Sequence, residues 1–272
     1  MSPPVALTVA GSDSGGAAGI AADLATFAAL GVHGACVVTA VTAQDTTGVR
    51  AVHAIPPEIV EAQLAAVLDD LPVGAVKTGM LGTADVVVLL STRLSASSAA
   101  RPLVVDPVLV ATSGAVLGGE EVRQAYLDHL LPVATVLTPN LDEARALLGH
   151  DGQDARPGEL AAALARLGPA TIVTGGPGAL GTGAGAGATC TDWLALPGRD
   201  PEPLTHPAVA TDNDHGTGCT FSAALAALLA AGVGLRTAAQ RAAAYTTRQL
   251  TLSTTWTLGR GRGPIAHIGG KS

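Results

Sequence analysis

Aromatic side chains are scarce in this chain. Phe, Trp and Tyr together supply 2% of its residues, whereas proteins that hold single-stranded nucleic acid stack the bases on such rings. Positive charge is also in deficit, because 15 Lys and Arg residues stand against 22 Asp and Glu residues and the net charge is −7. Phosphate backbones and anionic lipid surfaces repel a protein of this sign. We therefore expect neither a nucleic acid nor a membrane as a partner.

The chain has few cysteines, and its sequence shows no targeting pattern. The three cysteines (Cys36, Cys190 and Cys219) lie far apart and show no CxxC spacing, so their pattern predicts neither a disulfide framework nor a zinc site. Free cysteines suit a reducing compartment. The first residues, MSPPVALTVAGSD, lack the basic segment and sustained apolar stretch of a signal peptide, and no uninterrupted apolar run is long enough to span a membrane. We expect a cytoplasmic protein.

Apolar residues are plentiful and form a regular alternation. They make up 48% of the 272 residues, which is enough to bury a large core. Strands are predicted at residues 5–10, 35–41, 74–79, 102–105, 135–137, 170–174, 189–196 and 204–208, and helices at 17–30, 57–71, 83–94, 120–131, 158–167 and 235–250, with two more starting within 138–143 and just after Gly218. No linker interrupts them. The alternation predicts a single α/β domain over residues 1–272, a three-layer α/β/α sandwich around a central, mostly parallel sheet.

Polar residues or glycines follow most of the predicted strands. They are Gly11, Gln44, Gly79, Asp106, Asn140 and Gly175. Open α/β sheets bind ligands outside the carboxyl ends of their strands, so we expect these residues to face one edge. Gln44 is expected in a polar loop over residues 42–48. The acidic pair Asp142 and Glu143 at a helix start has a second explanation, because it would also favour the helix dipole.

The segment TDNDHGTGCTFSAALAALL, residues 211–229, is the most informative stretch. It reads as a polar loop, a glycine turn and then a long Ala/Leu helix. Gly216 and Gly218 would let several backbone N–H groups converge at the positive end of the helix, which makes an anion-binding cradle. Cys219 falls on the first turn, where a helix end lowers a thiol's pKa. The alternative is a tight turn that merely starts a buried helix. An anion site beside a proton acceptor favours phosphoryl transfer.

Two nucleotide-binding motifs can be weighed against this interpretation. The chain has no GxxxxGK[ST] motif, so a kinase of this sequence would not be of the P-loop type. Gly176, Gly178 and Gly181 match GxGxxG after a strand, which suggests a nicotinamide-dependent oxidoreductase. The residues that follow, TGAGAGAT, cannot open the helix that this fingerprint requires. We therefore reject the dinucleotide site and predict a flexible Gly/Ala flap there.

Motifs spread over nearly the whole chain carry a resemblance to a known family. They read ALTVAGSD, AGIAADL, GVHGACVVTAVTAQDTTGV, KTGML, VVDPVL, LTPNLDEA, HGTGCTFSAALAA and GPIAH. With them the chain resembles the ribokinase-like superfamily and, within it, the hydroxymethylpyrimidine and phosphomethylpyrimidine kinases of thiamine biosynthesis. HGTGCT is specific for this branch, since most sugar kinases of the superfamily have Asp at the position of Cys219. AQDTTGV is nearly as specific.

The resemblance implies an ATP- and Mg²⁺-dependent kinase for the small molecule 4-amino-5-hydroxymethyl-2-methylpyrimidine and its monophosphate. It implies an anion hole at Gly216, Thr217 and Gly218, with Cys219 facing the substrate hydroxyl; a substrate site at Gln44, Gly11, Asp23, Met80 and Val108; nucleotide contacts at Asn140, Thr174 and Gly176; and Asp106 and Glu143 near Mg²⁺, usually through water. The Gln44 carboxamide presents a donor and an acceptor side by side, which matches the edge of an aminopyrimidine. We also expect a homodimer.

Two positions depart from the family pattern. The usual PSGGAG loop is SGGAAG at residues 14–19, and the usual KGGH is TGGP at residues 174–177. Thr174 thus replaces a lysine that would make a charge-assisted contact with a phosphate. Either another cation substitutes, or the second phosphorylation is impaired, or the chain serves a related substrate. A pyridoxine-type vitamin kinase of the same fold and a pyrimidine sensor without turnover therefore remain alternatives.

Overall fold

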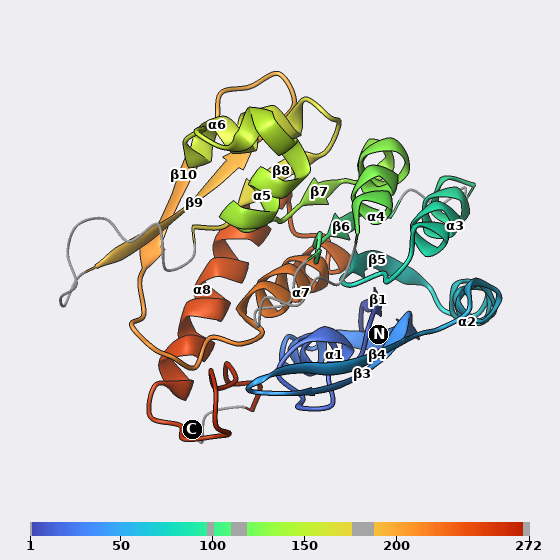
Figure 1. Cartoon of the computed structure of the whole chain (residues 1–272), viewed down its shortest axis with the longest axis horizontal. Helices are drawn as coiled ribbons and strands as arrows, with labels where there is room; N and C mark the ends of the chain where they lie inside the picture. Colours follow the sequence, from blue (N-terminus) through green and yellow to red (C-terminus); the bar gives the residue numbers. More distant parts are fainter. Residues whose placement is uncertain (1, 97–100, 110–118, 176–187, 269–272) are drawn as a thin grey trace.

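One large sheet organises the molecule. The computed structural model describes residues 2–96, 101–109, 119–175 and 188–268, and its main sheet has eight strands in the order β10-β9-β8-β7-β6-β5-β1-β2 (Figure 1). Six of them pair in parallel: β1 (Val5–Ala10), β2 (His33–Val38), β5 (Val73–Thr78), β6 (Leu103–Val105), β7 (Val136–Leu137) and β8 (Ala170–Val173). Strand β9 (Thr189–Ala195) is antiparallel to both β8 and β10 (Glu202–Pro207). The predicted mostly parallel sheet is confirmed.

Helices cover both faces of this sheet (Figure 1). One layer contains α2 (Pro57–Leu68), α3 (Ala84–Ser95), α4 (Glu120–Ala125), α5 (Leu141–Leu148) and α6 (Pro157–Ala165), and the other contains α1 (Gly19–Ala29), α7 (Thr217–Ala230) and α8 (Leu235–Ser253). Leu64 and Leu90 belong to the buried core on the first face, and Phe27 and Leu225 to the core on the second. The three-layer α/β/α arrangement is therefore confirmed.

The composition of the buried elements explains their positions. All six residues of β1 are buried, as expected for a parallel strand that is covered on both faces and reads as a continuous apolar run. Helix α7 buries nine of its fourteen residues, and these are mostly Ala and Leu. Its small side chains allow α7 to pack closely on β5, α1 and α8. The start of α7 is thereby fixed against the sheet.

A small second sheet was not predicted. The expected strand 35–41 ends at Val38, and the expected loop 42–48 is instead largely strand β3 (Ala40–Asp45), which pairs antiparallel with β4 (Gly48–Ala54). Ala40 and Thr42 are buried while Val41 and Ala43 are exposed, which is the period-two pattern of a half-buried strand. Gln44 therefore lies on a strand of this hairpin, and its expected place in a loop is wrong.

The predicted helix 120–131 is also irregular. It is α-helical to Ala125, continues as a π-helical turn over Tyr126–Leu130 and ends as a 3-10 turn over Leu131–Val133. A further 3-10 turn, Gly149–Gly152, follows α5. Pro132 lacks the N–H that a continued helix would need. The irregular turn brings the hydroxyl of Tyr126 to within 3.2 Å of the Gly79 carbonyl oxygen, to which it donates.

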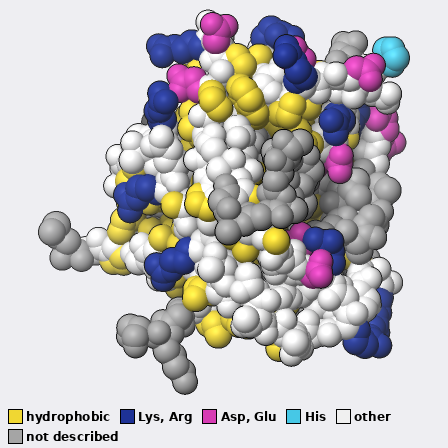
Figure 2. Space-filling model, turned by 90° about the vertical axis from the view of Figure 1, so that its left-hand side faces the viewer, with side chains coloured by type: hydrophobic (Ala, Val, Ile, Leu, Met, Phe, Trp, Pro, Cys, Tyr) yellow, Lys and Arg dark blue, Asp and Glu magenta, His cyan; other side chains and the backbone are white. Residues whose placement is uncertain are grey.

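Within the described part of the chain, none of the helices combines the length and the apolar character that a membrane crossing requires. Figure 2 shows the face seen from the left of Figure 1, and acidic and basic side chains are interspersed on it. This face therefore carries no large field of one sign.

Candidate active site

The glycine turn before α7 has the geometry of an anion cradle. Gly216 caps the helix with φ +91, and a Cβ atom there would lie 1.8 Å from the Ala17 carbonyl oxygen, so only glycine fits. Within the described residues, the N–H groups of Gly218 and Cys219 find no backbone or side-chain oxygen acceptor. Gly218 is exposed, with open space around its Cα. Two free N–H groups at the positive end of a helix can bind an anion.

Cys219 is not the activated thiol that the sequence suggests. Burial raises its pKa to about 12, although the nearby Lys77 ammonium works in the opposite direction. The expected lowering by the helix end is therefore wrong, because the cost of removing a thiolate from water outweighs the helix dipole here. At neutral pH the group at this position is a neutral thiol.

A buried network of charges lies beneath the cradle. The Lys77 Nζ atom is 2.9 Å from both carboxylate oxygens of Asp23 and 3.7 Å from Asp106 Oδ2. Thr8 donates to Asp23 at 2.6 Å, and Ser222 of α7 donates to Asp106 at 2.8 Å. Burial alone would lower the pKa of Lys77, but the surrounding charges and hydrogen bonds, those of Asp23 and Asp106 among them, together outweigh burial and the pKa is raised. Lys77 is therefore a fixed positive charge at the carboxyl end of β5.

Two acids come together at the ends of β6 and β7. Glu143 forms a capping box with Asn140, since its carboxylate accepts from the Asn140 N–H at 2.9 Å while the Asn140 side chain accepts from the Glu143 N–H at 2.9 Å. Burial and the neighbouring Asp106 raise the pKa of Glu143 to about 8, and burial also raises that of Asp106. Two buried carboxylates that repel each other are suited to share a divalent cation, and oxygen donors are the ligands that Mg²⁺ prefers.

The hairpin residue Gln44 reaches the start of α7. Its Nε2 atom is 3.0 Å from His215 Nε2. The same histidine nitrogen is 3.4 Å from Asp13 Oδ2, and Asp13 also accepts from the N–H groups of Gly15 and Ala18. Sequence reasoning did not identify Asp13 and His215, although both stand in recognised motifs, GSD and HGTGC. The pair fixes the first glycine loop against the cradle.

The remaining residues predicted around the substrate take different positions. Gly11 donates its N–H to the Met80 carbonyl oxygen at 3.1 Å, and the Met80 side chain packs directly on it. Val108 is half-buried two residues after Asp106. Asp23 is fully buried, so it can influence the site only through the groups that it contacts. Their roles toward a substrate stay predictions.

The predicted nucleotide-binding residues lie at the ends of β7 and β8. Thr174 forms a parallel bridge with Asn140, and its N–H donates to the Pro139 carbonyl oxygen at 2.9 Å. Asn140 is exposed and Thr174 half-buried. Gly176, together with the GxGxxG match and the expected Gly/Ala flap that follow it, lies outside the described residues.

The C-terminal tail, residues 254–268, contacts both the β3–β4 hairpin and the start of α7. The hydroxyl of Thr46, at the tip of the β3–β4 hairpin, accepts from the Arg260 and Gly261 N–H groups at 3.0 and 3.1 Å. Further along, the Ile265 N–H donates to the His215 carbonyl oxygen at 3.0 Å, and His267 Nε2 lies 3.0 Å from the Thr220 hydroxyl. The tail thus joins the hairpin to the start of α7.

Comparisons with known proteins agree with this arrangement. A family model described as phosphomethylpyrimidine kinase matches residues 13–266. The hydroxymethylpyrimidine/phosphomethylpyrimidine kinase of Synechococcus elongatus is 46% identical over 269 residues, which cover 98% of both chains. An ADP complex of pyridoxal kinase from Bacillus subtilis has a TM-score of 0.85 at 35% identity and 98% coverage of both chains. Phosphomethylpyrimidine kinase from Clostridium difficile has a TM-score of 0.72 at 32% identity, covering 90% of this chain and 98% of that one.

Proposed function

The chain belongs to the phosphomethylpyrimidine kinase family, and we propose that it transfers a phosphoryl group from ATP to 4-amino-5-hydroxymethyl-2-methylpyrimidine and then to the monophosphate, in thiamine biosynthesis. The observation that carries this proposal is the contact between Gln44 and His215 at 3.0 Å. Gln44, the residue that we propose to bind the pyrimidine ring, therefore lies beside His215, which immediately precedes the anion cradle. A ring held by Gln44 would present its hydroxymethyl group toward α7.

Ring recognition rests on the polar capacity of Gln44. A carboxamide has two N–H donors and two acceptor lone pairs. Whichever way the amide and the imidazole share their hydrogen bond, one donor and one acceptor remain for the 4-amino group and the neighbouring ring nitrogen. Asp13 and His215 would act as positioning residues, because their contacts hold Gln44 and the first loop in place.

Phosphoryl transfer rests on the cradle and the two acids. The free N–H groups of Gly218 and Cys219 would stabilise negative charge on the transferred group, with Gly216 and Thr217 fixing the turn. Asp106 and Glu143 would hold Mg²⁺, which supplies charge neutralisation at the phosphates when it is bound. Because this transition state is loose, the substrate hydroxyl can keep its proton until late. A neutral Cys219 thiol is compatible with that chemistry.

The second transfer brings an additional negative charge into the site. Lys77 is the one lysine of the described residues, and Asp23 already holds it in a fully buried ion pair. Thr174 contributes a hydroxyl where the family has a lysine, and Asn140 beside it contributes an amide. We expect ATP to bind through Asn140, Thr174 and Gly176, and the monophosphate to be the poorer substrate.

Pyridoxal phosphorylation is the second candidate activity. The TM-score to the Bacillus subtilis pyridoxal kinase exceeds that to the Clostridium difficile phosphomethylpyrimidine kinase. Overall shape does not decide between two substrates of similar size, since specificity depends on the groups at the site. The higher identity to hydroxymethylpyrimidine/phosphomethylpyrimidine kinases favours the pyrimidine.

The partner that we propose besides the small molecules is a second copy of the chain. Val41 and Val52, on the two strands of the β3–β4 hairpin, are 50% and 47% exposed. The two valines point to opposite faces of the hairpin, because Val52 pairs with Thr42 and Val41 pairs with His53, so they form no single apolar patch and the proposed dimer rests on the resemblance alone. Light scattering after size-exclusion chromatography distinguishes a dimer from a monomer.

One experiment tests the activity directly. The protein is incubated with ATP, Mg²⁺ and hydroxymethylpyrimidine, and mass spectrometry then shows whether the products carry one or two added phosphates. Pyridoxal in place of the pyrimidine is the matched comparison. Products with added phosphate from the pyrimidine support the proposal, whereas turnover of pyridoxal alone would assign the vitamin kinase activity. Binding of the pyrimidine without any turnover would identify a sensor.

A further inference from the structure

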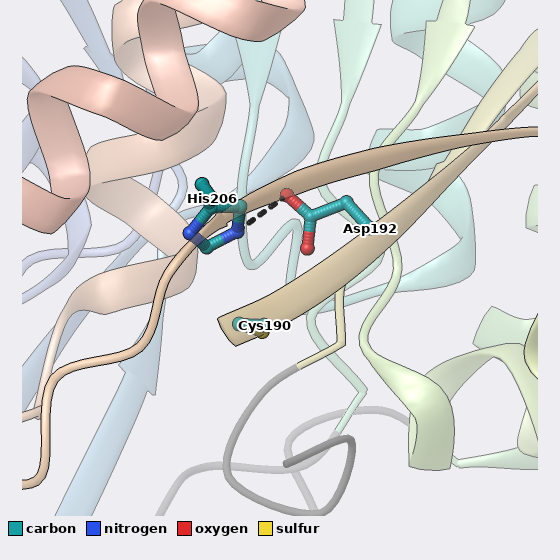
Figure 3. Close-up of side chains that lie close together, drawn as sticks. All are labelled: Cys190, Asp192 and His206. Carbon is teal, nitrogen blue, oxygen red and sulfur yellow. Dashed lines mark ion pairs between the residues drawn. The ribbon is translucent and has the colours of Figure 1, made fainter. Parts of the chain in front are cut away.

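The hairpin β9–β10 places three potential metal ligands on one face of the sheet. Cys190 and Asp192 are two residues apart on β9, so their side chains point to the same side. His206 of β10 is the direct cross-strand partner of Cys190, and directly opposed residues of an antiparallel pair have neighbouring side chains. Backbone register alone therefore brings a thiol, a carboxylate and an imidazole together (Figure 3).

Their donor atoms are already close to a coordinating arrangement. One ligand atom from each of the three residues lies within 4.8 Å of the other two, and His206 Nε2 is 3.3 Å from Asp192 Oδ2. Zinc binds these donors at about 2.0–2.3 Å, which in a tetrahedral site separates the ligand atoms by roughly 3.3–3.8 Å. Small side-chain rotations would close the remaining gap.

The surroundings of the three residues orient their ligand atoms, and a groove beside His206 gives a metal ion access to them. Cys190 and Asp192 are buried, whereas the His206 side chain is 21% exposed and lines a groove between β10 and α8 with Gln240 and Thr247. His206 Nδ1 lies 3.2 Å from the Pro207 carbonyl oxygen. A hydrogen bond from Nδ1 there fixes the ring and leaves Nε2 facing Asp192, where it could coordinate a metal after losing its proton, as metal-binding histidines require.

We propose that Cys190, Asp192 and His206 form a binding site for a divalent transition metal, with Zn²⁺ as the best match. Sulfur, nitrogen and oxygen donors together suit a metal of intermediate softness and disfavour Mg²⁺. Three protein ligands leave the fourth tetrahedral position to water. The cysteine spacing of the sequence gave no sign of this site, because only one of its ligands is a cysteine.

A nucleophilic Cys-His-Asp arrangement fits these residues less well. Such a triad places the acid on one imidazole nitrogen and the nucleophile on the other. Here Asp192 approaches Nε2, while the Pro207 carbonyl and the Thr247 hydroxyl lie 3.2 Å from Nδ1. Because one ligand atom from each of the three residues lies within 4.8 Å of the other two, shared coordination of a cation explains the geometry better.

Metal at this site would influence the candidate nucleotide site. The second oxygen of Asp192, Oδ1, accepts from the Gly175 N–H at 2.9 Å, and Gly175 directly follows Thr174. A metal bound to Oδ2 would fix the carboxylate and with it the end of β8. We therefore expect Zn²⁺ to change the KM for ATP, an effect that rests on the proposed kinase activity.

Metal binding itself is measured without any substrate. In the presence of excess Mg²⁺, Co²⁺ is titrated into the full-length protein, and the sulfur-to-metal charge-transfer band in the near ultraviolet reports a thiolate ligand. Zn²⁺ is then added to displace Co²⁺, and the Zn²⁺ dissociation constant is obtained from this competition. The variants are Cys190→Ser, Asp192→Asn and His206→Gln. Cys36→Ser and Cys219→Ser control for the other two thiols of the chain.

The expected result is a band in the wild type and in both control variants that is lost in Cys190→Ser. Zn²⁺ binding should weaken by about 100-fold or more in each site variant, since even losing an outer-shell partner costs about 10–100-fold. Zn²⁺ should also raise the Tm of the wild type but not of Asp192→Asn. A band that survives in Cys190→Ser, or no band in the wild type, overturns the proposal. An unchanged KM for ATP with intact metal binding would overturn only the link through Gly175.

Discussion

The Nε2 atom of Gln44 lies 3.0 Å from the Nε2 atom of His215, across 171 positions of sequence. Gln44 belongs to the β3–β4 hairpin and His215 to the turn before α7, so this contact joins the two sides of the candidate site. The imidazole uses only part of the hydrogen-bonding capacity of the carboxamide. Gln44 is thereby held in place and keeps hydrogen-bonding capacity for the proposed pyrimidine ring.

Replacing Gln44 by leucine should impair substrate binding rather than the chemical step. We expect Gln44→Leu to cost roughly 1–3 kcal/mol, mostly as a raised KM for the pyrimidine, because the polar edge of the ring loses its partner. Steady-state kinetics measure this, with the exposed Gln153→Leu as the control. If KM and kcat are both unchanged in Gln44→Leu, another side chain hydrogen-bonds to the polar edge of the pyrimidine ring.

Thr174→Lys should restore a cation beside the phosphates. We expect it to raise the rate of the second phosphorylation by about 10-fold or more and the first by less, since hydrogen bonds to charged groups contribute about 1.5–3 kcal/mol. Product mass and rate are followed separately for the alcohol and the monophosphate. Thr92→Lys is the control, because it adds the same charge on the exposed side of α3, away from the candidate site. Equal effects on both steps would mean that another cation already fills the role.

Cys219 and Gly218 should respond differently to substitution. The pKa of about 12 leaves almost no Cys219 thiolate at neutral pH, so Cys219→Ser should retain measurable turnover. Gly218→Val puts a branched side chain into the open space at the first turn of α7 and should lower kcat by at least about 10²–10³-fold, the loss expected for an anion-hole donor. Both are assayed at saturating ATP after circular dichroism shows that they are folded. Faster turnover by Gly218→Val than by Cys219→Ser would contradict the anion cradle.

Glu143 should make the protein without Mg²⁺ less stable as the pH rises. Its pKa is about 8 in the folded chain against an ordinary 4.5, so between these values the folded state holds a proton that the unfolded state has released. The free energy of unfolding should therefore fall from about pH 5 to about pH 8. Glu143→Gln should reduce this fall, with the remainder due to the buried Asp106, whose pKa is also raised, and should stabilise the protein by up to about 5 kcal/mol above pH 8, while losing kinase activity.

Urea unfolding at several pH values measures this effect, and Glu121→Gln on the exposed side of α4 is the control. Adding Mg²⁺ should reverse the trend for the wild type, since a cation favours the charged carboxylate. A wild type whose stability is independent of pH in this range would show that Glu143 is not buried beside Asp106 as a protonated acid.

The sequence predicted which residues lie at the carboxyl edge of the main sheet, but it did not predict the buried charged residues beneath them or the small hairpin. Gly11, Asp106 and Asn140 follow apolar strands, and parallel pairing places them at one edge. Lys77 was missed because a lone lysine in a buried strand has no periodic signature; only the fold reveals Asp23 beside it. The hairpin was missed because residues 42–48 are polar, and a two-stranded sheet that does not enter the main one gives only a weak alternating pattern.

The hydrogen bonds from the tail to Thr46 set an order for assembly of the molecule. Arg260 and Thr46 are 214 positions apart. During synthesis, Thr46 at the hairpin tip therefore cannot accept this hydrogen bond until nearly the whole chain has left the ribosome. Contacts of such long sequence separation form late and slow folding. An isolated two-stranded hairpin is marginally stable in water. A nascent chain that already has its strands and helices would therefore be unable to bind substrate until the GRGRG segment has emerged.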